Sequence, residues 1–359
     1  MAESNQITTK KLYKKLDKLF EASPVLELNS KKRWVIFSDL HMGDGGMTDD
    51  FKQNAKLFKS ALSDYYLKKD HALILNGDIE ELQRFQVKNI VNRWREVYDL
   101  FDAFNSKEAL YKTIGNHDLE LQLMKNLPFD YKHYDSLRLK FQDNSLFVFH
   151  GHQASKKYQE HNELIGFTLK YFANPLGIKS YSVSHSSKKQ YKIEKRVYGF
   201  SAFNKVVSII GHTHRPLFES LHKVDRIKYK IEQLCRDYAG ATSGQQETIK
   251  VDIKSHKKEL KQYYRENKDH SFQSYVYNTL FHIPCVFNSG CVVGKRGMTC
   301  LEIEGDKIRL VHWFDKKISK KYLKQSGYKP QQLGDTDFYR LVINEESLDY
   351  IFTRIKFLA

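Results

Sequence analysis

Several short apolar runs of this sequence end directly in side chains that can bind a metal ion, and this repeated arrangement constrains the fold most. The runs at 34–37, 72–75 and 110–114 alternate with helical stretches at about 50–68 and 88–105. Such alternation is typical of an α/β domain with parallel strands. Ligands collect at the carboxyl ends of parallel strands, so the side chains that follow these runs form the candidate functional site.

Two later apolar runs, at 146–149 and 206–210, end in histidine-containing loops. Each polar residue alone is a weak signal, because a turn carboxylate or an isolated histidine usually has a structural role. Gathered at one sheet edge, many histidines and carboxylates would be electrostatically costly without a cation among them. The candidates are Asp39, His41, Asp78, Glu81, Asn116, His117, Asp118, His150, His152, His212 and His214.

The donor types indicate which metals fit. Imidazoles, carboxylates and one amide oxygen, with no thiolate, suit Mn, Fe or Zn and argue against a structural zinc finger. In Asp39-x-His41 and in His212-x-His214, residues two positions apart share one face of an extended strand. The donors suffice for two ions about 3.5–4 Å apart, the spacing of two-metal hydrolases. We therefore predict two divalent metal ions as cofactors.

The motifs together resemble those of the calcineurin-like metallophosphoesterase superfamily, whose pattern is D-x-H, G-D-x-x-D/E, G-N-H-D/E, a later His, and G-H-x-H. The matching motifs stand at 39–41, 77–81, 115–118, 150 and 211–214. The resemblance covers about 33–215, the strand end at 288–290 and the final hairpin. It implies an α/β fold, a four-layer α/β/β/α sandwich, with a dinuclear centre between the strand loops.

The resemblance also implies roles for the candidate ligands. A hydroxide bridging the two ions would attack phosphorus in line, so the implied activity is that of a metal-dependent phosphoric ester hydrolase acting on a phosphomonoester or phosphodiester. The family pattern favours His150 over His152, which stands at the same strand end, and this choice stays open. One ion would be held by Asp39, His41 and His214, the other by Asn116, His150 and His212, with Asp78 bridging both.

Three further residues are expected to support catalysis rather than to bind metal. In the resemblance, His117 would protonate the leaving oxygen or stabilise developing charge, a general-acid role worth about 10²–10⁴-fold. Asp118 would assist it. Glu81 would orient His117 or support Asp78 from outside the metal shell.

The sequence is also similar to one branch of the superfamily, the bacterial UDP-diacylglucosamine pyrophosphohydrolases. The shared features are Arg215-Pro216 after the last motif, Met42-Gly43 after the first, and Glu81. This chain differs in having His117 where that branch usually carries Arg, and in its longer second insertion.

We predict one catalytic core at 33–314, preceded by a basic amphipathic helix within 1–32 and followed by a carboxy-terminal extension at 315–359. Two mainly helical insertions interrupt the core. These are a basic, aromatic-rich cap at 155–205 and a charged helical segment at 221–280. Docking of the amino-terminal helix on the core is favoured over its lying on a membrane.

The charge of the chain limits its partners without naming one. The 359 residues include 59 Lys and Arg against 43 Asp and Glu, a formal charge of +16. This excess fits nucleic acid, an anionic membrane surface or a phosphorylated substrate, and equally a lysine-rich surface that only maintains solubility. We predict a phosphorylated small molecule as partner, and leave nucleic acid, peripheral membrane contact and the oligomeric state open.

Two alternatives to a small-molecule phosphoesterase remain. A nuclease of the same superfamily would use the 155–205 segment to track a phosphate backbone and stack bases. A non-catalytic metal-binding scaffold is disfavoured because every motif position is filled. No apolar run approaches the roughly 20 residues of a membrane-spanning helix. The polar first ten residues and the four cysteines, without a disulfide or zinc pattern, lead us to expect a cytoplasmic protein.

Overall fold

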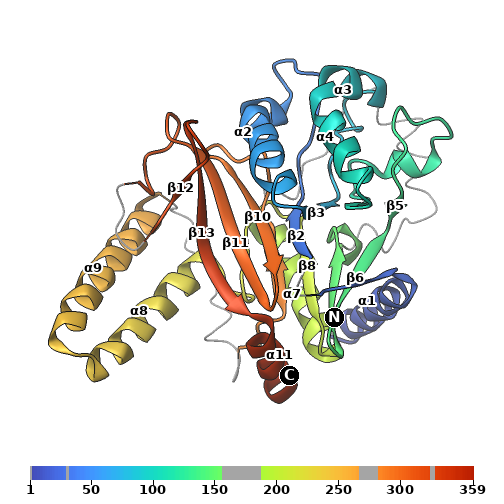
Figure 1. Ribbon diagram of the computed structural model, residues 1–359. Helices are drawn as coiled ribbons and strands as arrows, with labels where there is room; N and C mark the ends of the chain where they lie inside the picture. The colour runs from blue at the N-terminus through green and yellow to red at the C-terminus, as the bar shows by residue number, and fades with distance from the viewer. Residues whose placement is uncertain (1, 30–31, 156–186, 267–281, 324–327) are drawn as a thin grey trace.

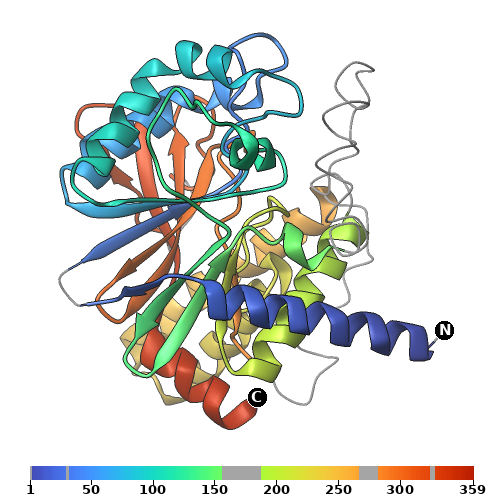
Figure 2. The ribbon, with the colours of Figure 1, turned by 90° about the vertical axis from the view of Figure 1, so that its right-hand side faces the viewer.

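The computed structural model describes residues 2–29, 32–155, 187–266, 282–323 and 328–359. Within these residues two β-sheets face each other, and helices cover their outer sides (Figures 1 and 2). The predicted α/β class and four-layer sandwich are therefore confirmed. None of the helices in the described residues has the length and apolar character needed to cross a membrane.

The larger sheet, called sheet 1 here, has a parallel half and an antiparallel half. Strands β2 to β5 run parallel, whereas β10 to β13 add antiparallel partners. Strand β3 is buried along its whole length, as expected for a parallel strand covered on both faces. The strand order is β12 (Gln331–Gln332), β13 (Phe338–Ser347), β11 (Lys307–Asp315), β10 (Met298–Glu304), β2 (Arg33–Phe37), β3 (His71–Asn76), β4 (Leu110–Thr113) and β5 (His133–Tyr134).

The smaller sheet, sheet 2, brings together segments from distant parts of the chain. Its centre is the predicted hairpin of β6 and β7, and β7 then pairs in parallel with β8. The amino-terminal segment contributes more than a helix, because β1 joins the edge of this sheet beside β6. The order is β1 (Val25–Glu27), β6 (Ser136–Phe141), β7 (Asn144–Phe149), β8 (Val207–Ile210) and β9 (Val286–Asn288).

Helices on the side of sheet 1 away from sheet 2 come mainly from the two stretches predicted to be helical, and the short η3 is an addition. The second stretch divides at Trp94, whose indole Nε1 donates to Gly43 O at 2.9 Å and to Asp49 Oδ2 at 3.0 Å. The elements are η1 (Asp50–Gln53), α2 (Ala55–Ser60), the π-helical turn η2 (Ala61–Leu67), α3 (Val87–Arg93), α4 (Arg95–Asn105) and η3 (Leu119–Leu123).

Sheet 2 is covered by α1 (Ala2–Ala22) and α7 (Ser187–Asn204). The short helix η4 (His152–Ala154) ends just before the predicted 155–205 cap. The described part of that cap is residue 155 and 187–205, where α7 packs on the sheet as part of the sandwich. Residues 156–186 of the predicted cap lie outside the described residues. The predicted docking of the amino-terminal helix agrees with the burial of Leu12 and Leu16.

The predicted helical segment at 221–280 contains a pair of adjacent helices, α8 (Lys223–Gly240) and α9 (Ser243–Glu266). They extend to one side of the sandwich (Figure 1). The rest of that segment, from 267 to 281, lies outside the described residues.

The carboxy-terminal residues are part of the sandwich rather than an appendage to it. Strand β13 pairs with β11 along its whole length, with a register shift between Leu310 and Val311. Helix α11 (Leu348–Leu358) buries Ile351 and Ile355 in the core. The sequence predicts only a closing hairpin at 299–314, so this third antiparallel strand is an addition that the structure reveals.

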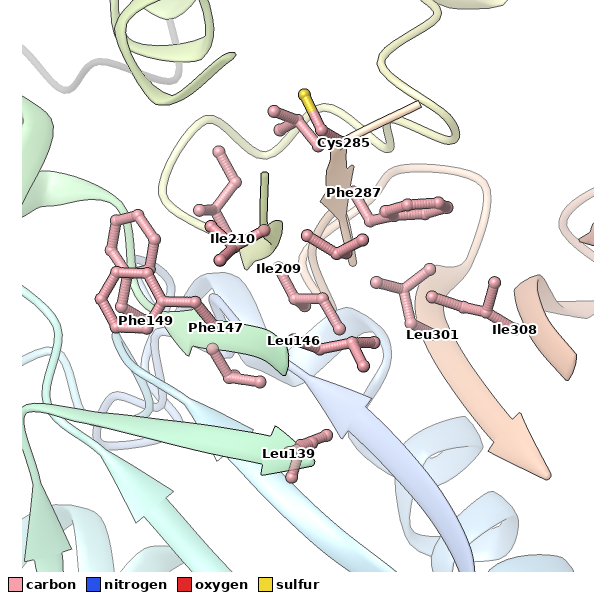
Figure 3. Close-up of a cluster of buried hydrophobic side chains, with 14 of the residues drawn as sticks. Leu139, Leu146, Phe147, Phe149, Ile209, Ile210, Cys285, Phe287, Leu301 and Ile308 are labelled. Carbon is pink, nitrogen blue, oxygen red and sulfur yellow. The ribbon is translucent and has the colours of Figure 1, made fainter. Parts of the chain in front are cut away.

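The core follows the two-residue period of the strands. In β2, Trp34 and Ile36 face sheet 2, whereas Val35 and Phe37 face the helices α2 to α4. Between the sheets, Leu139 and Ile209 of sheet 2 lie in one apolar cluster with Leu301 and Ile308 of sheet 1 (Figure 3). Burial of these side chains fixes the two sheets against each other, and with them the loops at their edge.

Candidate metal centre

The loops that follow five strands supply, from both sheets, the seven predicted ligands and the predicted acid His117. Sheet 1 contributes the loops after β2, β3 and β4, and sheet 2 contributes the loops after β7 and β8. From sheet 1 come Asp39, His41, Asp78, Asn116 and His117, and from sheet 2 come His150, His212 and His214. The predicted site residues therefore come from both sheets.

The structure brings seven of these eight side chains, all except that of Asn116, into three overlapping groups. In each group, one possible ligand atom of every member lies within 4.8 Å of the others. His41 and Asp78 each belong to two groups, so the groups form one continuous site. The groups are Asp39, His41 and His214; His41, Asp78 and His117; and Asp78, His150 and His212.

Carboxylates of sheet 1 face imidazoles of sheet 2 at short distances. Oδ1 of Asp39 lies 3.1 Å from Nε2 of His214, and Oδ2 of Asp78 lies 3.1 Å from Nε2 of His150. Nε2 of His41 is 3.0 Å from Nε2 of His214. Two imidazole nitrogens at this distance can share one proton or act as two ligands of one cation.

Two buried polar atoms of the site lack a hydrogen-bond partner within the described part of the chain, and a bound cation could take that place. Oδ1 of Asn116 and Nε2 of His212 are buried, and neither has a hydrogen-bond partner among the described residues. An unpaired buried polar atom carries a desolvation cost, which coordination of an ion removes. The donor set of imidazoles, carboxylates and one amide oxygen suits Mn, Fe or Zn. The residues present thus fit divalent metal ions, as predicted.

Protonation within the site shows the same need for positive charge. Burial lowers the pKa of His150, but Asp78 and Asp39 outweigh it and raise that pKa to about 9. Burial and the neighbouring charge of His150 lower the pKa of His212 to about 3. Burial also raises the pKa of Asp78, yet His150 and His117 hold it well below its ordinary value. The two carboxylates are thus ionised and surrounded by groups that compensate their charge.

The backbone adopts rarely populated conformations at these loops. The non-glycine residues Asp39, His41, Asp78, His212 and His214 have positive φ angles of 55°, 48°, 53°, 64° and 55°. Such conformations cost free energy and cluster at functional sites, where the surrounding structure enforces them. Each one turns the chain sharply at a strand end and directs a ligand inward.

Two glycines allow the loops to approach one another. A Cβ at Gly115 would lie 2.2 Å from Oδ1 of Asp78, and one at Gly211 would lie 2.5 Å from Oδ2 of Asp39. Both distances are shorter than real contacts, so any larger residue would displace a predicted ligand. This explains why glycine precedes the ligands in two of the motifs.

Outer hydrogen bonds fix the orientation of the imidazoles. Nδ1 of His150 lies 2.8 Å from the carbonyl oxygen of Asn76, and donation to it leaves Nε2 as the free ligand atom. Nδ1 of His41 lies 2.8 Å from Oε2 of Glu81. Metal-binding histidines typically have such a partner on their second nitrogen.

Glu81 holds two histidines at once. Its Oε1 is 2.8 Å from Nδ1 of His117, while its Oε2 contacts His41. Burial raises the pKa of Glu81, but the hydrogen bonds with His117 and His41 lower it to about 2, so the carboxylate stays ionised. Contact with His117 agrees with one predicted role of Glu81, and contact with His41 was not foreseen. No signal in the sequence distinguishes His41 from Asp78 as its partner.

His117 itself is close to the predicted ligands. Its Nε2 is 4.0 Å from Oδ2 of Asp78, and its ring lies edge-on to that of His41 with 4.7 Å between centroids. Burial lowers the pKa of His117, but Asp78 and the hydrogen bond to Glu81 outweigh it, so that its pKa is raised. A protonated His117 can therefore face the site.

Asp118 binds the backbone of two loops of the site. Its two oxygens accept hydrogen bonds from the backbone amides of Gly115 at 2.5 Å and Ile79 at 2.8 Å. Burial raises its pKa to about 7. This carboxyl group ties the loop after β4, which carries His117, to the loop after β3, and its assistance to His117 stays a prediction.

His152, the open alternative to His150, is buried beside the ligands. Its ring centroid lies 5.5 Å from that of His150 and 6.2 Å from that of His212. The groups of potential ligands in the described residues include His150 but not His152. The geometry therefore agrees with the choice of His150.

The structure adds residues to the site that the sequence did not single out. Thr213, between two predicted ligands, donates from Oγ1 to Oε1 of Glu194 at 2.9 Å and accepts from Nδ2 of Asn288 at 2.9 Å. Asn288 Nδ2 also donates to the carbonyl oxygen of Gly211 at 2.9 Å. Glu194 belongs to α7, inside the predicted cap, where no motif marks it.

Comparison with known proteins bears on the family of this chain. A family model described as calcineurin-like phosphoesterase matches residues 32–224, more than half of the chain. This chain belongs to the calcineurin-like phosphoesterase family. The resemblance drawn from the five motifs is thereby confirmed. Membership in this phosphoesterase family and the three groups of potential ligands support a metal-dependent phosphoesterase in general.

Solved structures with some similarity to this calcineurin-like phosphoesterase have low identity. A conserved uncharacterized protein and predicted phosphoesterase from Streptococcus pneumoniae TIGR4 is 12% identical, with a TM-score of 0.32, over 80% of this chain and 91% of that chain. A single mutant of Vps29 from Entamoeba histolytica is 10% identical, with a TM-score of 0.33, over 79% and 92%. Vacuolar Protein Sorting 29 from Cryptosporidium parvum is 9% identical, with a TM-score of 0.35, over 89% and 100%. Proteins with curated functions gave no match.

Proposed function

We propose that this chain hydrolyses a phosphomonoester or phosphodiester with two divalent metal ions, Mn, Fe or Zn. The observation that carries the proposal is the overlap of three ligand groups through His41 and Asp78. A single ion would need one group, whereas groups that share members suit two adjacent ions. The ions would be held by Asp39, His41 and His214 on one side and by Asn116, His150 and His212 on the other, with Asp78 between them.

Two bound divalent cations would supply an acidified water molecule and neutralise charge on the phosphoryl oxygens. The chain's own residues supply the rest of the chemistry. Glu81 keeps the Nδ1 proton of His117 engaged, so that Nε2 holds the proton that can move. We assign Nε2 of His117 as the donor to the oxygen of the leaving group, a role worth about 10²–10⁴-fold.

The proposed partner is a phosphorylated small molecule. A nuclease would depend on the basic 155–205 segment. Most of that segment lies outside the described residues, and its described part, α7, packs against sheet 2. The geometry thus gives the nuclease no support of its own.

Metal analysis combined with two phosphoester substrates tests the proposal. Manganese-loaded protein should contain two equivalents of metal and should cleave p-nitrophenyl phosphate or bis-p-nitrophenyl phosphate. Two equivalents of metal without cleavage of any ester in a panel of monoesters, diesters and nucleotides would favour a scaffold. Cleavage that is confined to nucleic acid and falls steeply with salt would favour the nuclease.

His117→Ala separates the acid role from metal binding. Because His117 is proposed as the acid and not as a ligand, the variant should keep both metals. It should lose little activity on p-nitrophenyl esters, since p-nitrophenolate leaves without protonation. On alkyl esters, whose leaving oxygen needs a proton, the loss should be about 10²–10⁴-fold. Loss of metal in this variant would instead make His117 a ligand of the group that it shares with His41 and Asp78.

A further inference from the structure

Helix α1 uses its apolar side for packing and turns its lysines outward. Leu12 and Leu16 are each 1% exposed and belong to the core cluster of sheet 2. Lys10 and Lys14, by contrast, are exposed. The apolar stripe of this helix is therefore covered already, and any contact with a partner must use its basic side.

Two phenylalanines, near the carboxyl ends of α7 and α11, are strongly exposed to solvent. Phe203, near the end of α7, is 76% exposed, and Phe357, near the end of α11, is 74% exposed. Nζ of Lys205 donates to the carbonyl oxygen of Lys356 at 3.4 Å, so the ends of these two helices are adjacent. In Figure 2 the carboxyl ends of α7 and α11 lie near each other below α1.

The same surface is cationic. The ring of Tyr13 in α1 lies 6.2 Å from that of Phe203, and Lys10 and Lys14 share the side of the helix that carries Tyr13. Oδ1 of Asp17, further along this side, already accepts a hydrogen bond from Asn204 at 3.1 Å. We call this surface the basic aromatic patch; it consists of Lys10, Lys14, Phe203, Lys205, Lys356 and Phe357.

We propose that the basic aromatic patch binds the surface of an anionic lipid bilayer. Exposed aromatic rings enter the boundary between headgroups and acyl chains, and surrounding lysines are attracted to anionic headgroups. A purely electrostatic partner, such as duplex nucleic acid, would use the lysines but would gain nothing from two exposed phenylalanines. The net charge of +16 adds to the attraction.

The patch lies away from the metal centre. Helix α7 ends at Asn204 and leads into the start of β8 at Val207, whereas the ligands His212 and His214 follow the other end of that strand. Binding through the patch would therefore leave the catalytic edge away from the bilayer surface. Variants of the patch should not change activity on a soluble phosphoester.

Co-sedimentation of the full chain with vesicles tests the proposal. The protein should bind vesicles of phosphatidylcholine and phosphatidylglycerol in equal parts but not vesicles of phosphatidylcholine alone. Phe203→Ser with Phe357→Ser, and separately Lys205→Glu with Lys356→Glu, should each weaken binding by about tenfold or more. A matched control changes exposed residues of α9, Val251→Ser with Tyr264→Ser, and should bind as the parent does.

A second measurement reports insertion directly. Phe203→Trp places an exposed indole in the patch, whereas Trp34, Trp94 and Trp313 are buried at 1%, 6% and 0% exposure. Addition of anionic vesicles should shift the emission of this variant to shorter wavelength and leave that of the parent unchanged. Absence of vesicle binding, or equal binding by the phenylalanine pair variant and the α9 control, would overturn the proposal. Binding by the patch to an acidic protein or to nucleic acid, with none to vesicles, would overturn it as well.

Discussion

The two sheets contribute different chemistry to one site. The loops of sheet 1 bring both carboxylates and the amide, Asp39, Asp78 and Asn116, whereas the ligands from sheet 2 are all imidazoles. The short contacts cross between the sheets, from Asp39 to His214 and from Asp78 to His150, at 3.1 Å each. Two of the three ligand groups, Asp39–His41–His214 and Asp78–His150–His212, need members from both sheets. The apolar cluster between the sheets is therefore as necessary to the site as the ligands themselves.

The largest expected effect follows from removing the residue that connects both halves. Asp78 contacts His150 of sheet 2 and accepts a hydrogen bond from the backbone amide of His117 at 2.8 Å. Asp78→Ala should lower bound metal from two equivalents to one or none. Activity should fall by more than the about 10–100-fold that loss of an outer partner costs. Asp44→Ala, an exposed carboxylate in the loop after His41, is the control and should change neither quantity.

A second comparison sharpens the contribution of sheet 2. His150→Ala removes a predicted ligand, while His152→Ala removes a buried neighbour at the same strand end. The first variant should lose one metal equivalent and most activity, and the second should keep two equivalents. Metal analysis of the two purified proteins decides which histidine is the ligand. Loss of metal in His152→Ala with two equivalents kept in His150→Ala would make His152 the ligand.

A smaller effect is expected at Glu81, which contacts both the predicted ligand His41 and the predicted acid His117. Glu81→Gln keeps the size of the side chain but removes the charge that contacts His41 and His117. Metal affinity and turnover should each fall by about 10–100-fold. Titration with metal and measurement of kcat at saturating metal separate the two losses. Glu21→Gln on the exposed side of α1 is the matched control, and an equal loss there would rule out the assigned role.

The smallest effect concerns stability rather than catalysis. Burial raises the pKa of Glu194 from 4.5 to about 7, so the folded state holds this proton more tightly than the unfolded chain does. Stability from this group is present below about pH 4.5 and is lost as pH rises towards 7. Glu194→Gln does not titrate, so its free energy of unfolding relative to the parent should rise between pH 5 and pH 8.

Urea unfolding in a chelating buffer measures this difference. Glu232→Gln, an exposed carboxylate of α8, is the control and should show no such trend. A constant difference between Glu194→Gln and the parent across the pH range would contradict the assigned protonation.

The sequence predicted the strands that carry the ligands because motif and strand end coincide there. The apolar run at 72–75, for example, forms β3, and the predicted ligand Asp78 follows the end of that strand. The same short stretch of sequence therefore indicates both the strand and the site residue. It could not predict the support given by Glu194, since α7 is distant in the chain and reaches Thr213 only after sheet 2 has formed. Likewise, a motif cannot show that the oxygens of Asp118 accept hydrogen bonds from backbone amides.

Strand β13 illustrates a second limit. Its pairing with β11 is interrupted by a shift in register between Leu310 and Val311, which breaks the two-residue period that marks a strand. The sequence also could not predict that the rings of Phe203 and Phe357 are exposed. Their meaning depends on the ends of α7 and α11 meeting in space.

Anomalous scattering from a crystal grown with manganese tests the central claim most directly. The account predicts two adjacent metal peaks, with the Asp78 carboxylate between them and the remaining six ligands divided as proposed. A single peak, or ions bound by other residues while Asn116 and His212 stay uncoordinated, would contradict it.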